Sequence, residues 1–207
     1  MRARGASQLA PAVCAQWCRT ATSLVLPRFS LGTRPLLDER KYELVYDSTQ
    51  GISPSEAGLK PVASRNIVAG EVVFQEDGKL RTSPGLYTIQ IDFDQHLEML
   101  GDVRYTAHSF SPTCYCRIME LSDKPIDIVA LRDIRRGEEI SFDYETTEWE
   151  LLDGGFIDGN SGRACQGFKH KSEEDKSALL VSGILPKHIL RLWIQEMLER
   201  GVPAEPS

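Results

Sequence analysis

Between positions 42 and 142 the apolar residues come in short runs, and glycine-containing turns separate these runs. The stretch Leu86–Phe93 alternates apolar and polar residues with a period of two, which is the pattern of a half-buried strand. Similar signals predict further strands at 43–46, 126–131 and 139–142, and a strand–turn–strand unit over 64–74 with its turn at Ala69-Gly70. Many short strands joined by glycine turns favour a mainly β domain over alternating β–α–β units.

The C-terminal part follows a different pattern. Ser172 precedes three acidic residues, which suit a helix N-terminus, so a helix is predicted over 172–181. Pro186 is expected to open a second helix. Apolar residues recur there at helical spacing, at Ile189, Leu192, Trp193 and Met197. We expect this stripe to pack on the β domain; a groove for a partner protein is the alternative.

The length of 207 residues suffices for one packed domain with terminal extensions. No run approaches the roughly 18 apolar residues of a membrane helix, so a soluble protein without a membrane partner is expected. The cysteine count is odd, and two of the five lie near the N-terminus, which argues against a secreted disulfide framework. They are Cys14, Cys18, Cys114, Cys116 and Cys165. A reducing compartment fits better.

The charge is distributed unevenly. Residues 1–37 contain five arginines and no Asp, Glu or Lys. All 30 acidic residues therefore lie in 38–207 with 19 of the 24 basic ones, and the net charge of that part is −11. Such an acidic surface disfavours direct nucleic-acid binding and would attract a basic protein segment. The alternative is that the excess acid only aids solubility.

The N-terminal segment is rich in Arg, Ala, Ser and Thr and free of acid, which is the composition of an organelle transit peptide. It would direct the protein to a mitochondrion or plastid. The other interpretation is an extension without targeting function, which would leave the protein in the nucleus or cytoplasm. In either case residues 1–40 are expected to lie outside the fold.

Two segments carry the chemistry. Arg104–Cys114 reads RYTAHSFSPTC, and Gly137–Tyr144 reads GEEISFDY. Taken singly, a histidine beside a serine is usually structural, and a tyrosine at the end of a strand is usually part of the core. In this order and at this separation, they resemble the two motifs of the SET domain, R-[FY]-x-N-H-S-x-x-P-N-[CV] and G-E-E-[LI]-x-[FY]-D-Y. The resemblance extends over roughly residues 55 to 170, since 64–73 resembles the opening hairpin of SET domains and Gly167–His170 a segment that follows them.

The SET domain is the β-rich fold of protein-lysine methyltransferases. The resemblance implies several short curved sheets and a knot-like crossing of the two motif segments. The methyl donor S-adenosylmethionine would bind on one side, and a narrow lysine channel would open from the other. The implied organisation is an extension over 1–40, a SET-like domain over 41–150, a degenerate post-SET-like segment over 151–170, and two α-helices with a tail over 171–207.

The resemblance also implies roles for individual residues. Tyr144 would be catalytic, placing its hydroxyl near the sulfonium methyl and the lysine nitrogen. The attacking amine must be neutral although the pKa of free lysine is about 10.4, so a desolvated channel is required. Its walls would be Phe142, Tyr105 and Tyr87, although ordinary core is an alternative for both tyrosines. Phe142 leaves room for more than one methyl group. The donor-binding residues would be Gly58, Leu59, Lys60, Arg104, Ala107, His108, Ser109 and Phe168, the last covering the adenine.

Several positions depart from the family pattern. The second glycine of a donor-binding Gly-x-Gly is Lys60, the first Asn of the histidine motif is Ala107, and its second Asn is Thr113. A zinc-binding C-x-C-x-x-x-x-C segment retains only Cys165, beside Cys114. Cys116 and His170 could complete four ligands. If Cys114 and Cys116 lie on one strand, they point the same way, and we expect a trailing segment without zinc, held by the C-terminal helices.

Two functions therefore remain open. One is a protein-lysine N-methyltransferase that uses S-adenosylmethionine and acts on a lysine of a protein substrate, histone or other, in a basic segment. The alternative is a non-catalytic SET-fold protein that binds a protein or peptide. Tyr144, Asp143, His108 and Ser109 favour the enzyme, whereas Lys60 and Ala107 favour the binding module. The sequence does not indicate the substrate, the degree of methylation or the oligomeric state.

Overall fold

The computed structural model describes residues 40–46, 58–119 and 125–201. These ranges belong to one compact unit, Glu39–Ser207. The predicted transit-peptide-like segment lies outside them. Within the three ranges, no helix combines the length and the apolar character needed to cross a membrane.

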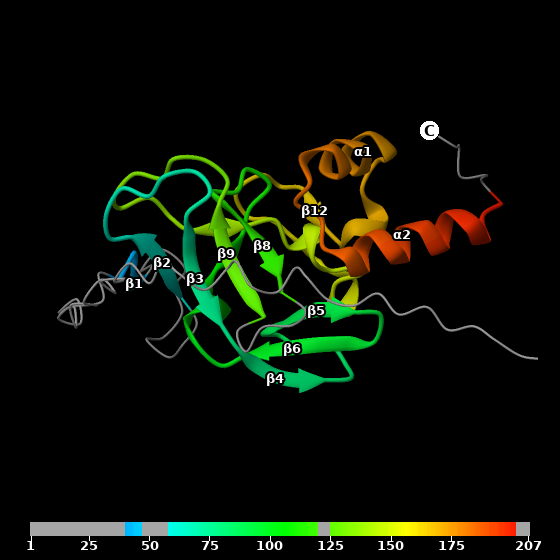
Figure 1. The fold of residues 1–207 in the computed structure, drawn as a ribbon, viewed down its shortest axis with the longest axis horizontal. Helices are drawn as coiled ribbons and strands as arrows, with labels where there is room; N and C mark the ends of the chain where they lie inside the picture. Colours follow the sequence, from blue (N-terminus) through cyan, green and yellow to red (C-terminus); the bar gives the residue numbers. More distant parts are fainter. Residues whose placement is uncertain (1–39, 47–57, 120–124, 202–207) are drawn as a thin grey trace, which may run out of the picture. The chain divides into compact units, whose positions relative to one another are not determined.

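In the described ranges the chain forms short strands arranged in small sheets, as predicted (Figure 1). An antiparallel pair joins the first two strands, and two three-stranded antiparallel sheets have the orders β3-β9-β8 and β4-β6-β5. The strands are β1 (Tyr42–Tyr46), β2 (Leu59–Ala63), β3 (Val72–Glu76), β4 (Gly78–Arg81), β5 (Thr88–Asp92), β6 (Gln95–Met99), β7 (Ala107–His108), β8 (Cys114–Ile118), β9 (Ile126–Ala130), β10 (Ser141–Phe142), β11 (Phe156–Ile157) and β12 (Ala164–Cys165).

The main core forms around β9, in which every residue is buried. A strand buried on both faces requires a nearly continuous apolar run, and Ile126–Ala130 reads IDIVA. The neighbouring β8 buries Cys114 and Cys116 while Tyr115 between them is only half-buried, so the two cysteines share one face as predicted. Phe74 from β3 and Phe142 from β10 complete this core.

The predicted strand–turn–strand unit over 64–74 is partly wrong. Its second strand is β3, but the first lies earlier in the chain, at β2. Residues 64–71 instead form turns held by Ile67 and Ile134, whose backbones exchange two hydrogen bonds of 2.9 Å. Pro61 obscured β2 in the sequence. The strand nevertheless pairs with β1 on one side, and on the other side the Pro61 carbonyl accepts the Ile140 N–H at 2.9 Å.

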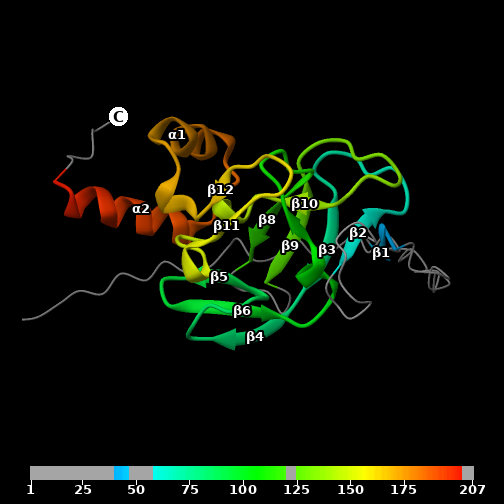
Figure 2. The ribbon, with the colours of Figure 1, turned by 180° about the vertical axis from the view of Figure 1, so that it is seen from behind.

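The strand predicted over Leu86–Phe93 is shorter, because β5 spans only Thr88–Asp92. A register shift between Gln90 and Asp92 interrupts the alternation, so that Gln90 is buried whereas Phe93 is exposed. Figures 1 and 2 show β5, β6 and β4 as a separate sheet beside β3, β9 and β8. This sheet supplies one side of the cavity described below.

The two predicted helices are confirmed as α1 (Glu173–Ser182) and α2 (Lys187–Glu199). Ser172 caps α1 by accepting a hydrogen bond from the Asp175 N–H at 3.1 Å, and α1 ends at Gly183. The apolar stripe of α2 is buried, but its main contact differs from the expected β domain: Ile189 and Trp193 pack against Phe168, in the segment after the second motif. The helices therefore cover the segment that follows the second motif.

Candidate active site

The two motif segments meet side by side. The strand β7 pairs in parallel with β10, so that Ala107 lies opposite Ser141 and His108 opposite Phe142. The Ser109 N–H extends this pairing by donating to the Phe142 carbonyl at 3.1 Å. Segments 34 residues apart in sequence are thereby fixed against each other.

Thr113, one of the departures from the family pattern, joins the two segments a second time. Its buried hydroxyl accepts a hydrogen bond from the Ser141 N–H at 2.9 Å and lies 3.1 Å from the Glu139 carbonyl oxygen, to which it can donate. One hydroxyl thus bonds to Glu139, which precedes β10, and to Ser141, which belongs to β10. This substitution keeps the segments connected.

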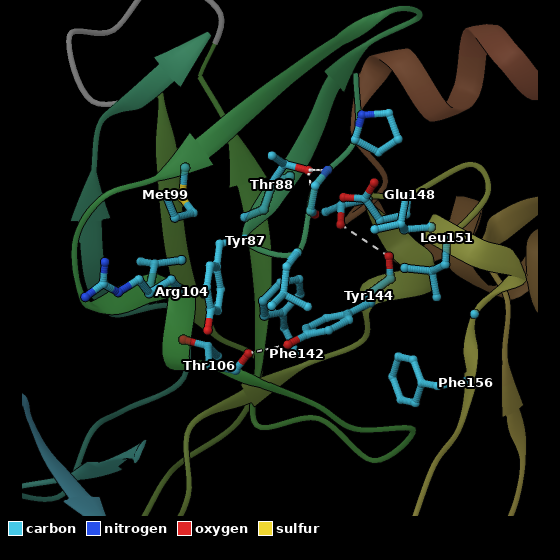
Figure 3. A pocket seen from close by; sticks show the side chains of 18 of the residues that line it. Tyr87, Thr88, Met99, Arg104, Thr106, Phe142, Tyr144, Glu148, Leu151 and Phe156 are labelled. Carbon is cyan, nitrogen blue, oxygen red and sulfur yellow. Dashed lines mark hydrogen bonds between the residues drawn. The ribbon is translucent and has the colours of Figure 1, made fainter. Parts of the chain in front are cut away.

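A cavity of about 300 Å³ opens beside this junction (Figure 3). The Tyr87, Phe142 and Tyr144 side chains point into it, and Phe156 faces them across the hollow. Its wall also includes Arg104, Thr106, Met99, Glu148 and Leu151. Aromatic and aliphatic groups dominate the wall, which suits the methylene chain of a long side chain.

Tyr144 is held in one orientation at this cavity. Its hydroxyl donates to the Thr106 carbonyl oxygen at 2.6 Å, and its ring lies 4.9 Å from the Phe142 ring, centroid to centroid. Burial raises the pKa of Tyr144, and the nearby Cys165 and Glu148 add to this rise. The hydroxyl therefore stays protonated at neutral pH, with its oxygen lone pairs available to accept a hydrogen bond.

His108 lies behind Tyr144 and is buried. Its Nδ1 accepts a hydrogen bond from the Tyr144 N–H at 3.2 Å, which places the ring proton on Nε2. Burial lowers the pKa of His108, although Asp143 opposes this shift, so the ring is neutral. No described residue accepts a hydrogen bond from the buried Nε2. A ligand acceptor at this point would satisfy it.

The predicted donor-binding residues fit a donor in part. Gly58 has φ of +101°, a conformation that favours glycine, just before β2. Lys60, at the position of the second glycine, forms an ion pair with Glu139 at 3.0 Å, so its charge is already compensated. Together with the Nε2–H of His108, which has no acceptor among the described residues, this leaves the site compatible with S-adenosylmethionine.

Two predicted site residues lie elsewhere. Tyr105 is not part of the described cavity wall; its hydroxyl accepts a hydrogen bond from the Arg104 guanidinium at 2.6 Å. Phe168 is fully buried between Trp149 and Trp193 in the cluster under α2. It exposes no surface in this structure, and its contact with an adenine ring stays a prediction. The remaining channel residues, Tyr87, Phe142 and Tyr144, do converge.

A family model of the SET domain matches residues 38–145, which is more than half of the chain. The chain belongs to the SET domain family. Among curated proteins, it is 36% identical over 86 residues to the histone-lysine N-methyltransferase trr of Drosophila melanogaster, covering 37% of this chain and 4% of that protein. It is 33% identical over 100 residues to the histone-lysine N-methyltransferase trithorax of Drosophila virilis, covering 40% of this chain and 3% of that protein. The chain thus spans only a small part of these relatives.

A solved structure of a candidate histone methyltransferase from Plasmodium falciparum is also similar. The TM-score is 0.42 at 18% sequence identity, and the match covers 51% of this chain and 94% of that one.

The segment that follows this SET domain is held by charged groups. The Lys171 side chain is 8% exposed, and its ammonium lies 2.9 Å from an Asp143 oxygen and 2.7 Å from a Glu145 oxygen. The other Glu145 oxygen accepts the N–H of Gln166 at 2.8 Å. These contacts attach residues 166–171 directly to the second motif.

The zinc pattern would require cysteines at 158, 160 and 165, and the first two are Asp158 and Asn160. The Asp158 carboxylate accepts the Ser161 N–H at 2.8 Å and closes this loop. Cys165 lies 3.7 Å from His108 Nδ1, measured from its sulfur. Within the described ranges, no group of three or more His, Cys, Asp or Glu residues is arranged to hold a metal ion. A zinc-free segment stays a prediction.

Sequence reasoning missed one ionisable residue of the cavity, Glu148. It is 7% exposed and accepts the Gln90 N–H at 2.8 Å. Burial raises its pKa to about 7, against the opposing effect of that hydrogen bond. Its place four residues after Tyr144 was the available signal, but a glutamate at the end of a motif is normally exposed.

Proposed function

We propose that this SET domain protein is a protein-lysine N-methyltransferase that transfers a methyl group from S-adenosylmethionine to a lysine of a protein substrate. One observation carries the proposal: the Tyr144 hydroxyl is fixed on the Thr106 carbonyl at 2.6 Å, at the wall of a mainly apolar cavity. The histone-lysine N-methyltransferase names of the two relatives support the same class.

The cavity residues would prepare the lysine. Tyr87 and Phe142 exclude water from its methylene chain, which favours the neutral amine over the ammonium. The Tyr144 oxygen accepts a hydrogen bond from the amine and thereby orients the nitrogen lone pair. Since Phe142 brings no hydroxyl of its own, an amine that already carries a methyl group can still enter, and we propose that more than one methyl is added.

The donor would be held by Gly58, Arg104, Ala107, His108 and Ser109. When bound, its sulfonium supplies the methyl group as an electrophile. His108 contributes the buried Nε2–H, and Gly58 leaves room for close backbone approach. The Lys60 ammonium is paired with Glu139, so it does not bring an uncompensated positive charge to the donor site.

The substrate is proposed to be a protein that presents its lysine in a basic segment, because residues 38–207 carry the net charge of −11. Direct nucleic-acid binding is not part of the proposal. The compartment remains a prediction from the N-terminal composition.

Calorimetric titration of S-adenosylmethionine into the full chain tests the donor site. We expect saturable binding, weakened about tenfold or more in His108→Ala, because the variant lacks a hydrogen bond donor that has no other described partner. The matched control is His170→Ala, which removes an exposed histidine and should bind as the wild type does.

Absence of binding at about 1 mM donor would contradict the enzyme. It would favour a non-catalytic SET-fold protein that binds a peptide. Equal affinities in wild type and His108→Ala would contradict the assigned donor site.

A further inference from the structure

The cavity contains a buried carboxylate that the proposed chemistry has not used. Glu148 is fixed by the main chain of β5: its Oε1 accepts the Gln90 N–H at 2.8 Å. Gln90 in turn accepts the Trp149 N–H at 2.8 Å through its side-chain oxygen. Figure 3 shows Glu148 above Tyr144 in the cavity wall. The carboxylate therefore lies in the cavity wall in a defined position.

Among the described residues, this carboxylate has no counter-ion. No Lys, Arg or His of those ranges lies within ion-pair distance of Glu148, whereas Asp143 and Glu145 share Lys171. Its charge still reaches the reaction centre, because it contributes to raising the pKa of Tyr144. A buried carboxylate without a cation is costly, and a cation entering the cavity would be attracted to it.

Groups from several elements surround Glu148. Tyr144 and, from β8, Cys116 both have raised pKa values to which Glu148 contributes. On the side of α2, His188 bonds to the Thr147 carbonyl at 2.9 Å, and burial lowers its pKa, so it is neutral. The other ionisable groups of the wall are Tyr87, Arg104 and Asp153. Asp153 is exposed, so Glu148 is the buried carboxyl of the described wall.

We propose that Glu148 receives the ammonium group of the incoming lysine and accepts its proton, so that a neutral amine reaches Tyr144. The inference rests on the proposed function and adds the group that prepares the amine. The proton moves from the lysine nitrogen to a carboxylate oxygen of Glu148. The freed lone pair then attacks the methyl carbon as its bond to sulfur breaks, the methylated nitrogen keeps the positive charge, and Glu148 releases its proton to solvent.

Two physical arguments support this direction of proton transfer. In water a carboxylate would not deprotonate a lysine whose pKa is about 10.4. In an apolar cavity the exchange converts two buried charges into two neutral groups, which removes the desolvation cost of both. The pKa of Glu148, raised to about 7 by burial, reflects the desolvation cost of its own negative charge. Tyr144 cannot accept this proton in place of Glu148, because the raised pKa of Tyr144 keeps its hydroxyl protonated.

The test uses n-butylamine as a probe of the lysine side chain and n-butanol as its uncharged match. The full chain carries carbon-13 at the glutamate carboxyl groups, and no donor is added. At about pH 8 the Glu148 carboxyl should be ionised in the free protein. We expect saturating n-butylamine to move its NMR resonance to the protonated position, whereas n-butanol leaves it in place. Glu148→Gln identifies the resonance.

The same variant measures recognition. The amide introduced by Glu148→Gln keeps an oxygen that can accept the Gln90 N–H, so the fold is retained, which unchanged n-butanol binding would verify. We expect Glu148→Gln to bind n-butylamine about tenfold or more weakly, and the control Glu150→Gln, at an exposed position, to bind as the wild type does. The proposal is overturned if the carboxyl stays ionised at saturation, if Glu148→Gln binds n-butylamine unchanged, or if the wild type does not bind it. Since no donor is present, these outcomes are independent of the donor titration.

Discussion

Thr113 illustrates how one hydroxyl can hold two motif segments together. Replacing it with the isosteric valine leaves the Ser141 N–H without its hydrogen bond acceptor at a buried position. We expect Thr113→Val to lower the free energy of unfolding by about 1–3 kcal/mol, measured by urea denaturation. Thr113→Ser retains the hydroxyl and is the control. A loss in Thr113→Ser with none in Thr113→Val would show that the methyl group, and not the hydrogen bond, stabilises this position.

Residue by residue, the sequence predicted those site members whose positions follow from the two motifs. Phe142 and Tyr144 converge with Tyr87, although β5 is shorter than expected. The burial of Phe168 could not be predicted from the sequence, because it depends on Trp193 of α2, 25 residues further along the chain. Glu148 could not be predicted either, because only the fold reveals that the Gln90 backbone buries and holds it.

At the scale of elements, Lys171 connects the segment before α1 to the second motif. Burial alone raises the pKa of Glu145, but the Lys171 ammonium and the backbone N–H groups of Gln166 and Gly167 outweigh it, and the net pKa is lowered. Desolvation likewise lowers the pKa of Lys171, and Asp143 and Glu145 outweigh that effect. The segment is thus held by a buried ion pair instead of depending on apolar contacts alone.

Lys171→Met should therefore destabilise the protein by about 3–5 kcal/mol at neutral pH, because the carboxylates of Asp143 and Glu145, whose side chains are 12% and 6% exposed, lose their cation. The lowered pKa of Glu145 implies a stabilisation that is fully present above its unfolded value near 4.5 and disappears as the pH falls through the lower folded value. The difference between variant and wild type should shrink in acid. Thermal denaturation across pH, with Lys169→Met at a half-buried position as control, checks both points. A constant difference at every pH would contradict the ion pair as its origin.

The elements themselves were predictable where one pattern dominated. The buried run of β9 and the capped α1 were placed correctly from sequence. The strands β4 and β6 were not predicted, because β6 reads QHLEM and alternates too little to signal a strand. Their pairing in the β4-β6-β5 sheet supplies the regularity that the local sequence lacks.

At the scale of the whole molecule, the central claim is that this SET domain protein transfers methyl groups to lysine. The most direct measurement is formation of S-adenosylhomocysteine by the full chain, given S-adenosylmethionine and a mixture of basic lysine-containing proteins that includes histones. We expect product formation that falls about 100-fold or more in Tyr144→Phe, because the hydroxyl that orients the amine is absent while the ring and fold remain. Lysine methylation of a protein in the mixture, seen by mass spectrometry, would accompany it. Product formation no greater than that of Tyr144→Phe, from a wild-type chain that binds the donor, would contradict the account.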